Sequence, residues 1–118
     1  MRRDSATGRL EFYGINWQGS SNVLLLLCDR WTNPTTYSAL VASAQLARMT
    51  FANIYLQLVD DNTNVSCKWS LDGVNWTQLT SFARAAFLAN ANQIGLAVFT
   101  QQNGGTVYLQ SDWLRRTA

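Results

Sequence analysis

The sequence contains no histidine, and this absence excludes more than any other feature of its composition. Histidine is the most common general base and the most common metal ligand in proteins, so a Ser-His-Asp triad and a histidine-based metal centre are both excluded. Charged residues are also scarce, at 14%, whereas 47% of the residues are hydrophobic. This composition is typical of a folded chain and argues against disorder.

Clusters of positive charge and long apolar runs are lacking too. Eight of the nine basic residues are arginines, and they are scattered without forming a basic stripe, so we expect no nucleic-acid partner. The longest wholly apolar run, Val23 to Cys28, is far shorter than the roughly 20 residues of a membrane span. The N-terminal segment MRRDSATGR has no apolar core of the kind that export requires. We therefore expect a chain made soluble in a cytoplasm, with no membrane insertion.

The chain has two cysteines, Cys28 and Cys67, and neither belongs to a CxxC pair or a Cys/His spacing. Both fall inside expected strands. Buried free thiols are the simpler interpretation, and a disulfide between adjacent strands is the alternative.

Most of the chain alternates between apolar and polar residues, and no stretch holds a helical period for three turns. This pattern predicts an all-β fold: a two-sheet antiparallel β-sandwich that forms a single domain over residues 1–118. The alanine-rich segment 82–91 predicts one short helix, and residues 44–51 could hold one helical turn or a short connection. The expected strands cover residues 10–17, 23–30, 37–43, 54–60, 65–69, 76–79, 94–98 and 107–113. The expected turns are GSSN at 19–22, WTNPTT at 31–36, DDNTN at 60–64 and NGG at 103–105.

One expected strand departs from the alternation. Four consecutive leucines, Leu24 to Leu27, make both of its faces apolar, where a solvent-facing strand would alternate. Something must therefore cover its second face.

The acidic residues give little support for catalysis. A glycosidase needs two carboxylates across a cleft, but most of the acidic residues lie in or beside turns, where an Asp usually bonds its own backbone. The segment 60–64 offers oxygen ligands from Asp60, Asp61, Asn62 and Asn64, so calcium is an alternative there. It lacks the regular alternation and the distal Glu of a dedicated calcium loop. We expect no enzyme, no metal and no cofactor.

The aromatic residues are more informative, since the chain has five Trp and four Tyr. Trp69 and Trp76 flank the stretch SLDGVNW, where Asp72-Gly73 predicts a hairpin turn, and we expect the two rings to pack together as structural residues. Trp31 and Tyr37 flank the proline turn next to Arg30. An aromatic and an arginine on a loop are typical of a sugar platform or a protein contact, and structural packing is the alternative.

Taken in order, several segments resemble the concanavalin A-like, LamG-type jelly-roll domains of tail and fibre proteins of bacteriophages and prophages. The segments are RDSATGRL at 3–10, DRWTNPTTYSA at 29–39, IYLQLVDDNTN at 54–64, SLDGVNWTQL at 70–79, ARAAFL at 83–88 and IGLAV at 94–98. Each motif alone is weak, and their order and spacing carry the resemblance. The chain departs from the family at its start, since the RDSATG-like segment normally follows one or more initial strands. We therefore expect missing N-terminal strands and an unpaired sheet edge.

The resemblance implies a non-enzymatic virion protein, made in the host cytoplasm, whose lectin-like domain contacts a host-surface glycan or another virion subunit. Together with the two-sided apolar strand, it implies a homo-oligomer, with a trimer as the expected symmetry. One alternative is a virion decoration or assembly protein without a ligand. Another is an accessory carbohydrate-binding module of a glycoside hydrolase, or the hydrolase itself, for which Asp29 and Asp112 are the carboxylates to test.

Overall fold

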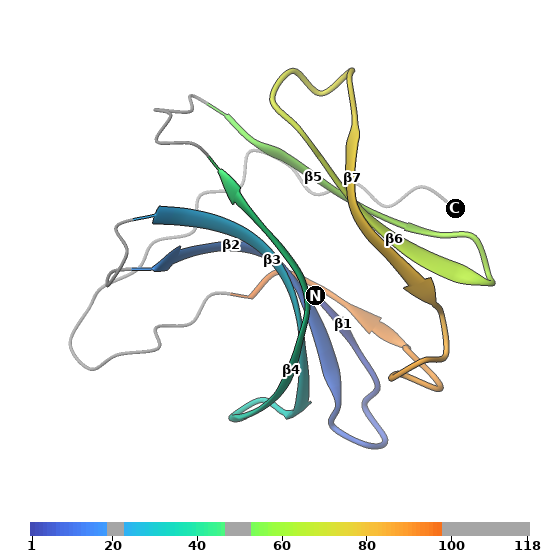
Figure 1. The fold of residues 1–118 in the computed structure, drawn as a ribbon. Coiled ribbons are helices and arrows are strands. Elements are labelled where there is room, and N and C mark those ends of the chain that lie inside the picture. The colour runs from blue at the N-terminus through green and yellow to red at the C-terminus, as the bar shows by residue number, and fades with distance from the viewer. Residues whose placement is uncertain (19–22, 47–52, 98–118) are drawn as a thin grey trace.

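The computed structural model of the protein describes residues 1–18, 23–46 and 53–97 (Figure 1). Within these ranges the chain consists of antiparallel strands joined by turns and contains no helix. The strands are β1 (Arg2–Arg3), β2 (Leu10–Gln18), β3 (Val23–Asn33), β4 (Thr36–Leu46), β5 (Tyr55–Asp60), β6 (Asn64–Ser70), β7 (Thr77–Ala83) and β8 (Gln93–Ile94). The predicted all-β class is confirmed.

The larger sheet has five strands in the order β4-β3-β2-β1-β8. β2 and β3 form a regular ladder from the Leu10–Trp31 pair at one end to the Gln18–Val23 pair at the other. A regular register of this kind keeps alternate residues on the same side of the sheet. The β3–β4 pairing is interrupted by register shifts, the first of which lies between Cys28 and Asp29. Such bulges bend and twist a strand.

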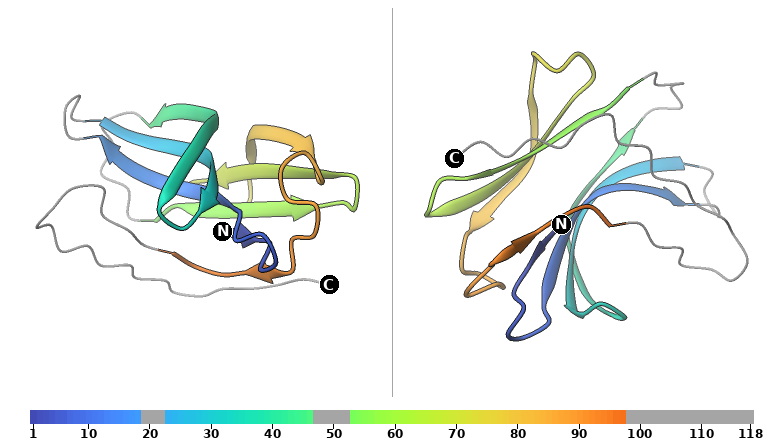
Figure 2. Two further views of the ribbon diagram at one scale, coloured as in Figure 1. Left: turned by 90° about the horizontal axis from the view of Figure 1, so that it is seen from below. Right: turned by 180° about the vertical axis from the view of Figure 1, so that it is seen from behind.

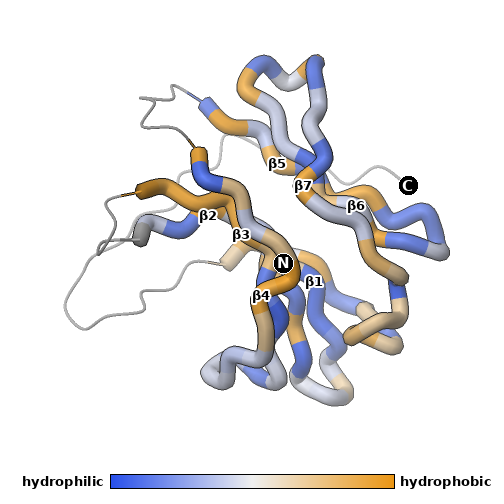
Figure 3. Tube along the Cα trace, in the orientation of Figure 1, coloured by the Kyte–Doolittle hydropathy of each residue, from blue (hydrophilic) through white to orange (hydrophobic). Residues whose placement is uncertain are grey.

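The smaller sheet has three strands in the order β5-β6-β7 and lies against the larger sheet as a second layer (Figure 2). The two antiparallel sheets agree with the predicted β-sandwich. Hydropathy differs between the layers, because β3 carries a long apolar stretch while the strands of the smaller sheet mix apolar and polar residues (Figure 3).

The core lies between the two sheets, and its fully packed members come from β2, β3, β4 and β6. They are Tyr13, Leu26, Cys28, Leu46 and Cys67. The Tyr13 hydroxyl crosses the gap between the layers and donates a 2.8 Å hydrogen bond to the backbone carbonyl oxygen of Lys68 in β6. This bond satisfies the polar end of a buried tyrosine and ties the sheets together.

Cys28 and Cys67 are buried free thiols, so the simpler interpretation of their sequence context is confirmed. The alternative assumed a disulfide between adjacent strands. The two residues instead belong to different sheets, since Cys28 lies in β3 and Cys67 in β6.

The prediction of a short helix at 82–91 is wrong. Phe82 and Ala83 extend β7 and pair with β6, and the chain then turns so that the backbone N–H of Ala86 donates to the carbonyl of Ala83 at 2.9 Å. The side chain of Leu88 is almost fully buried. The high helix propensity of alanine amounts to only a few tenths of a kcal/mol per residue, which strand pairing and the burial of larger side chains outweigh.

The turn expected over residues 31–36 is shorter than predicted. β3 continues to Asn33 and β4 begins at Thr36, so only Pro34 and Thr35 connect them. The side-chain oxygen of Asn33 accepts hydrogen bonds from both the backbone N–H and the hydroxyl of Thr35 at 3.0 Å. A proline inside the connection and an Asn that bonds the turn backbone are the usual components of a tight hairpin.

Other differences lie at the ends of elements. β1 was not predicted, and it has a neighbour on both sides, β2 and β8, so the N-terminal segment does not form the expected unpaired edge. Residues 44–46 extend β4 instead of starting a connection, and β8 (Gln93–Ile94) shares only Ile94 with the strand expected at 94–98. The GSSN and NGG turns and the strand expected at 107–113 lie outside the described residues. No described segment forms a helix with the length and apolar character needed to cross a membrane.

Candidate functional site

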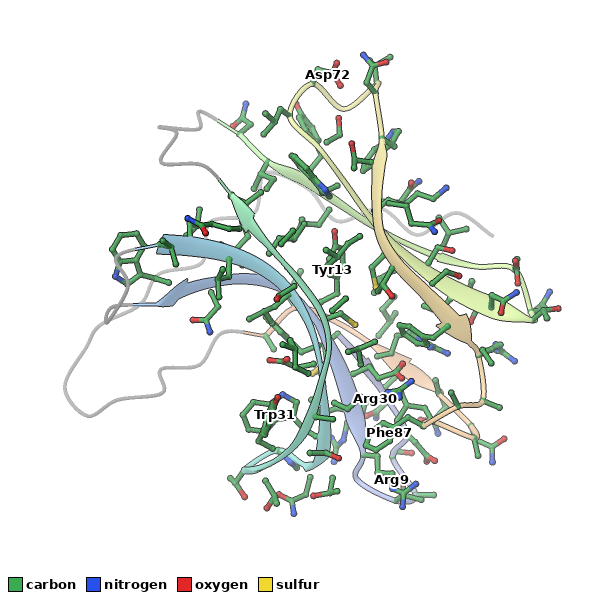
Figure 4. All side chains as sticks on the ribbon, in the orientation of Figure 1. Arg9, Tyr13, Arg30, Trp31, Asp72 and Phe87 are labelled. Atoms are coloured by element: carbon green, nitrogen blue, oxygen red, sulfur yellow. The ribbon has the colours of Figure 1, made fainter. Side chains whose placement is uncertain are left out.

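The side of the larger sheet that faces away from the smaller sheet carries its own set of side chains, and we call this side the outer face. The register pairs Phe12 with Asp29 and Gly14 with Leu27, which places these four residues on the outer face. Tyr13 lies between them in sequence and points into the core. In Figure 4, Trp31 lies on the outer side of β3, whereas Tyr13 and Arg30 point toward the smaller sheet.

The outer face is hollowed by a groove of about 310 Å³, which we call the outer groove. Its size is near the lower end of the range for small-molecule sites, roughly 300–1,000 Å³. β2, β3 and β4 all contribute to it, and two of its β4 residues, Tyr37 and Leu40, are about half exposed. The described residues that line it are Asn16, Leu25, Leu27, Asp29, Tyr37, Leu40 and Ser43.

Asp29 is the charged residue among the described residues of the outer groove. It is only 5% exposed, and burial raises the pKa of its carboxyl group to about 6. None of the residues that the structure describes donates a hydrogen bond to this carboxyl group or forms an ion pair with it. Buried polar groups normally have partners, so an acceptor that is left open toward a groove is a candidate for binding an external hydrogen-bond donor.

Tyr37 and Trp31 face each other across the β3–β4 hairpin. Their ring centroids are 5.5 Å apart and their planes meet at 85°, which is an edge-to-face contact. Tyr37 lines the outer groove, and Trp31 supports its ring from the neighbouring strand. Both lie in strands and not on the loop that the sequence suggested. The two rings therefore pack against each other, and contact with a ligand or partner stays a prediction.

Arg30 is separated from this pair, because it lies on the inner side of β3. Its Nε donates to Glu11 at 3.2 Å, and its guanidinium lies 5.1 Å from the ring centre of Phe82 and 5.3 Å from that of Phe87. These are cation–π distances. Arg30 thus joins the two layers, and the structure does not bring it together with Trp31 and Tyr37 as a contact site.

The interaction of Arg30 belongs to a chain of ion pairs that the sequence did not reveal. Glu11 also accepts from Arg2 at 3.0 Å, and Arg2 lies 3.6 Å from Asp60, which pairs with Arg84 at 2.9 Å. Burial raises the pKa of the Glu11 carboxyl group, and Arg2 and Arg30 oppose this shift. One sequence signal could have revealed these ion pairs. Glu11 shares the inward side of its strand with Tyr13, and a buried carboxylate needs a cationic partner.

The stretch SLDGVNW forms the connection between β6 and β7. Gly73 has a positive φ of 73°, and the side chain of Asp72 accepts from the backbone N–H groups of Val74 and Asn75 at 2.8 Å each. The hydrogen bond from the side chain of Asn75 and those from the backbone hold the pKa of the Asp72 carboxyl group far below its usual range. Asp72 thus orders the turn through hydrogen bonds.

The two tryptophans that flank this hairpin differ in their surroundings. Trp69 packs against the core, whereas Trp76 is 38% exposed, and the described residues include no ring contact between them.

Both carboxylates of the acidic turn between β5 and β6 have partners within the protein. Asp60 accepts from the backbone N–H of Asn62 at 3.1 Å and from Arg84 at 2.9 Å. Asp61 accepts from the backbone N–H groups of Thr63 and Asn64. No cluster of three or more His, Cys, Asp or Glu side chains that could hold a metal ion occurs in the described part of the chain.

Sequence reasoning missed three residues of the outer groove, Asn16, Leu40 and Ser43, and it considered Asp29 only as a catalytic carboxylate. Tyr37 and Leu40 are three positions apart, so simple alternation places them on opposite faces. They share a face because the register shifts: Tyr37 pairs with Trp31 and Leu40 with Asp29, which leaves an extra residue in β4. No sequence signal marks this bulge.

Comparisons of the chain with protein-family models, with curated proteins and with solved structures gave no match. The function must therefore be argued from the groove itself. An apolar groove with one tyrosine ring, one carboxyl group, one amide and one serine hydroxyl group can bind a small ligand that has both apolar C–H surfaces and hydroxyl or amine donors.

Proposed function

We propose that the protein is a non-enzymatic contact module whose outer groove binds a saccharide of a host cell surface. The observation that carries this proposal is the position of the Asp29 carboxyl group, buried and without a described partner, in the same groove as the half-exposed ring of Tyr37. A sugar ring can lay its C–H face on an aromatic or aliphatic wall while its hydroxyl groups donate to a carboxylate, and hydrogen bonds to a charged acceptor are the stronger kind.

We further propose the setting that the sequence resemblance implies: a bacteriophage virion, with this chain as a tail- or fibre-associated lectin-like domain of the concanavalin A-like jelly-roll type. The support for this setting is the order of the motifs in the sequence. A sandwich with a recognition groove on one sheet is compatible with it, because function lies in the site that a fold carries and not in the fold itself.

A glycan array at pH 7.5, containing bacterial cell-surface saccharides, tests the proposal. We expect the wild-type protein to bind a chemically related subset. Tyr37→Ala should weaken binding to that subset by about two- to tenfold, because one aromatic stacking contact is worth roughly 0.5–1.5 kcal/mol.

The matched control is Tyr55→Ala, which removes a tyrosine from β5 in the smaller sheet. It should bind the same subset as the wild type. Absence of binding to every saccharide, or an equal loss in the two variants, would count against the outer groove as a saccharide site.

The leucines of the groove favour a second candidate, contact between virion subunits. Leu25, Leu27 and Leu40 give the outer groove an apolar wall that another copy of the chain could cover, and Leu40 is 52% exposed. On this interpretation the protein is a homo-oligomer, with a trimer as the expected symmetry, or a decoration protein without a ligand. Sedimentation equilibrium distinguishes the two candidates. If the wild type is an oligomer and Leu40→Glu dissociates it, subunit contact is favoured. If the wild type is a monomer, subunit contact is excluded.

A role in a glycoside hydrolase receives less support from the geometry. Glu11 lies on the inner side of the larger sheet, bound to two arginines, and Asp29 lies on its outer face. These two buried carboxyl groups therefore do not face a common cleft, as a catalytic pair must. Asp112, the other carboxyl group considered from the sequence, lies outside the described residues.

A further inference from the structure

The two cysteines form a close pair at the centre of the sandwich. Cys28 comes from the larger sheet and Cys67 from the smaller one, and their exposed fractions are 1% and 0%. Their sulfur atoms are 3.8 Å apart. A disulfide bond is about 2.05 Å long, so the two sulfur atoms would have to approach each other by less than about 2 Å. Side-chain rotation and a shift between the sheets would have to supply this movement.

We propose that Cys28 and Cys67 form an intramolecular disulfide bond between the two sheets when the protein folds in the presence of a thiol oxidant such as glutathione disulfide. This proposal rests on the core alone and is independent of the function proposed for the outer groove. It assigns a covalent modification site to two residues that the groove does not use.

The reaction requires one molecule of the oxidant. The thiolate of one cysteine attacks glutathione disulfide, which gives a mixed disulfide and releases one glutathione thiolate. The second cysteine thiolate then attacks the protein sulfur of that mixed disulfide, so the protein disulfide forms and the second glutathione leaves. The two cysteines lose two protons and two electrons, and glutathione disulfide is reduced to two glutathione molecules.

The burial of the pair determines when this exchange can take place. The neighbouring Cys28 thiol and burial raise the pKa of the Cys67 thiol far above its usual range. The attacking species in thiol–disulfide exchange is the thiolate, so the folded core holds Cys67 as an unreactive thiol. The bond therefore forms during folding, before the sheets close, and the folded reduced protein should resist the same oxidant.

The consequence for the molecule is a covalent link between its layers. The two cysteines are 39 positions apart, so the bond closes a loop that contains the end of β3, all of β4 and β5, and the start of β6. Closing a loop of this length restricts the unfolded chain and stabilises the folded one.

Refolding of the full chain tests the proposal. The protein is unfolded in denaturant with a reductant, and one half is refolded with reductant while the other half is refolded in a buffer of reduced and oxidised glutathione. We expect the second sample to be a monomer two hydrogen atoms lighter, to give a cross-linked Cys28–Cys67 peptide on digestion, and to melt roughly 10 °C higher than the first. If the second sample is unfolded again, reduced and refolded with reductant, its melting temperature should fall to that of the first sample.

Cys67→Ala is the matched control, because it keeps Cys28 and removes the partner. It should show no upward shift of the melting temperature in the glutathione buffer. If this variant does not fold, the comparison between the two wild-type samples still decides. Stable mixed disulfides with glutathione, cross-linked dimers, or an oxidised monomer that melts at or below the temperature of the reduced one would each overturn the proposal.

Discussion

At the scale of single residues, two aspartates show how surroundings decide what a carboxyl group does. Asp72 is exposed and accepts several hydrogen bonds within its turn, so its charged form is favoured. Asp29 is buried in the outer groove, so its charged form is disfavoured. Sequence reasoning assigned a turn role to Asp72 because Asp-Gly between two strands is a local signal. It could not assign a groove role to Asp29, because burial depends on three strands at once.

The raised pKa of Asp29 predicts a dependence of stability on pH. Between about pH 4 and pH 6 the folded protein holds a proton that the unfolded chain has lost, so the free energy of unfolding falls as the pH rises through this window and is constant above it. The loss is up to about 3 kcal/mol.

Asp29→Asn removes this contribution, so urea denaturation at pH 7.5 should show the variant to be more stable than the wild type by about 1–3 kcal/mol. At pH 4 the two proteins should be similar. An equal difference at the two pH values would contradict the assigned cause.

For Asp72 the dependence of stability on pH has the opposite sign. Its lowered pKa stabilises the folded state above about pH 4, the pKa of an unfolded Asp, and this contribution disappears as the pH falls further. Asp72→Ala should therefore lower the melting temperature at pH 7, and the difference from the wild type should shrink below pH 4. Asp72→Asn keeps an acceptor oxygen, so its melting temperature should fall by less than that of Asp72→Ala. Saccharide binding should be unchanged in both variants, and weakened binding at unchanged stability would show that Asp72 belongs to a site.

At the scale of elements, β3 explains the run of four leucines. Leu26 points into the core and is fully buried, whereas Leu25 and Leu27 line the outer groove on the other side. The sequence predicted this strand, its two apolar faces and the need to cover the second face. It could not predict that residues 82–91 form the end of β7 and a turn in place of a helix, because alanine content is a local property and pairing with β6 is not. The sequence also could not predict the bulge that places Tyr37 and Leu40 on the same face of the sheet.

A pair of substitutions tests the orientation of these strands. Leu26→Ala should cost about 2–5 kcal/mol of unfolding free energy, since it leaves a cavity in the core. Leu40→Ala, on the outer face, should cost less than about 1 kcal/mol. Chemical denaturation of the two variants gives both values. Similar losses would mean that the two faces of the larger sheet are equally buried.

At the scale of the whole molecule, contacts between the sheets are polar as well as apolar. One end of the interface holds the ion pairs from Arg30 through Glu11 and Arg2 to Asp60, and its centre holds the hydrogen bond from Tyr13 to the Lys68 carbonyl. The sequence predicted a sandwich, but it could not predict which residues meet across it, because that depends on how the layers are placed relative to each other.

Tyr13→Phe removes only the hydroxyl group that bridges the layers. We expect a loss of about 1 kcal/mol in the free energy of unfolding, the usual net value of one hydrogen bond. Tyr55→Phe is the control, because no hydrogen bond of its hydroxyl group is found within the described residues. Equal effects of the two substitutions in urea denaturation would exclude a special role for the bond between the sheets.

The central claim is that the outer groove recognises a saccharide through Asp29. Isothermal titration at pH 7.5 of the saccharide bound best on the array, with the wild type and with Asp29→Asn, tests it most directly. We predict that Asp29→Asn binds at least about tenfold more weakly, because a charged acceptor is replaced by a neutral one, although this variant is the more stable of the two. Equal affinity of the two proteins would contradict the claim.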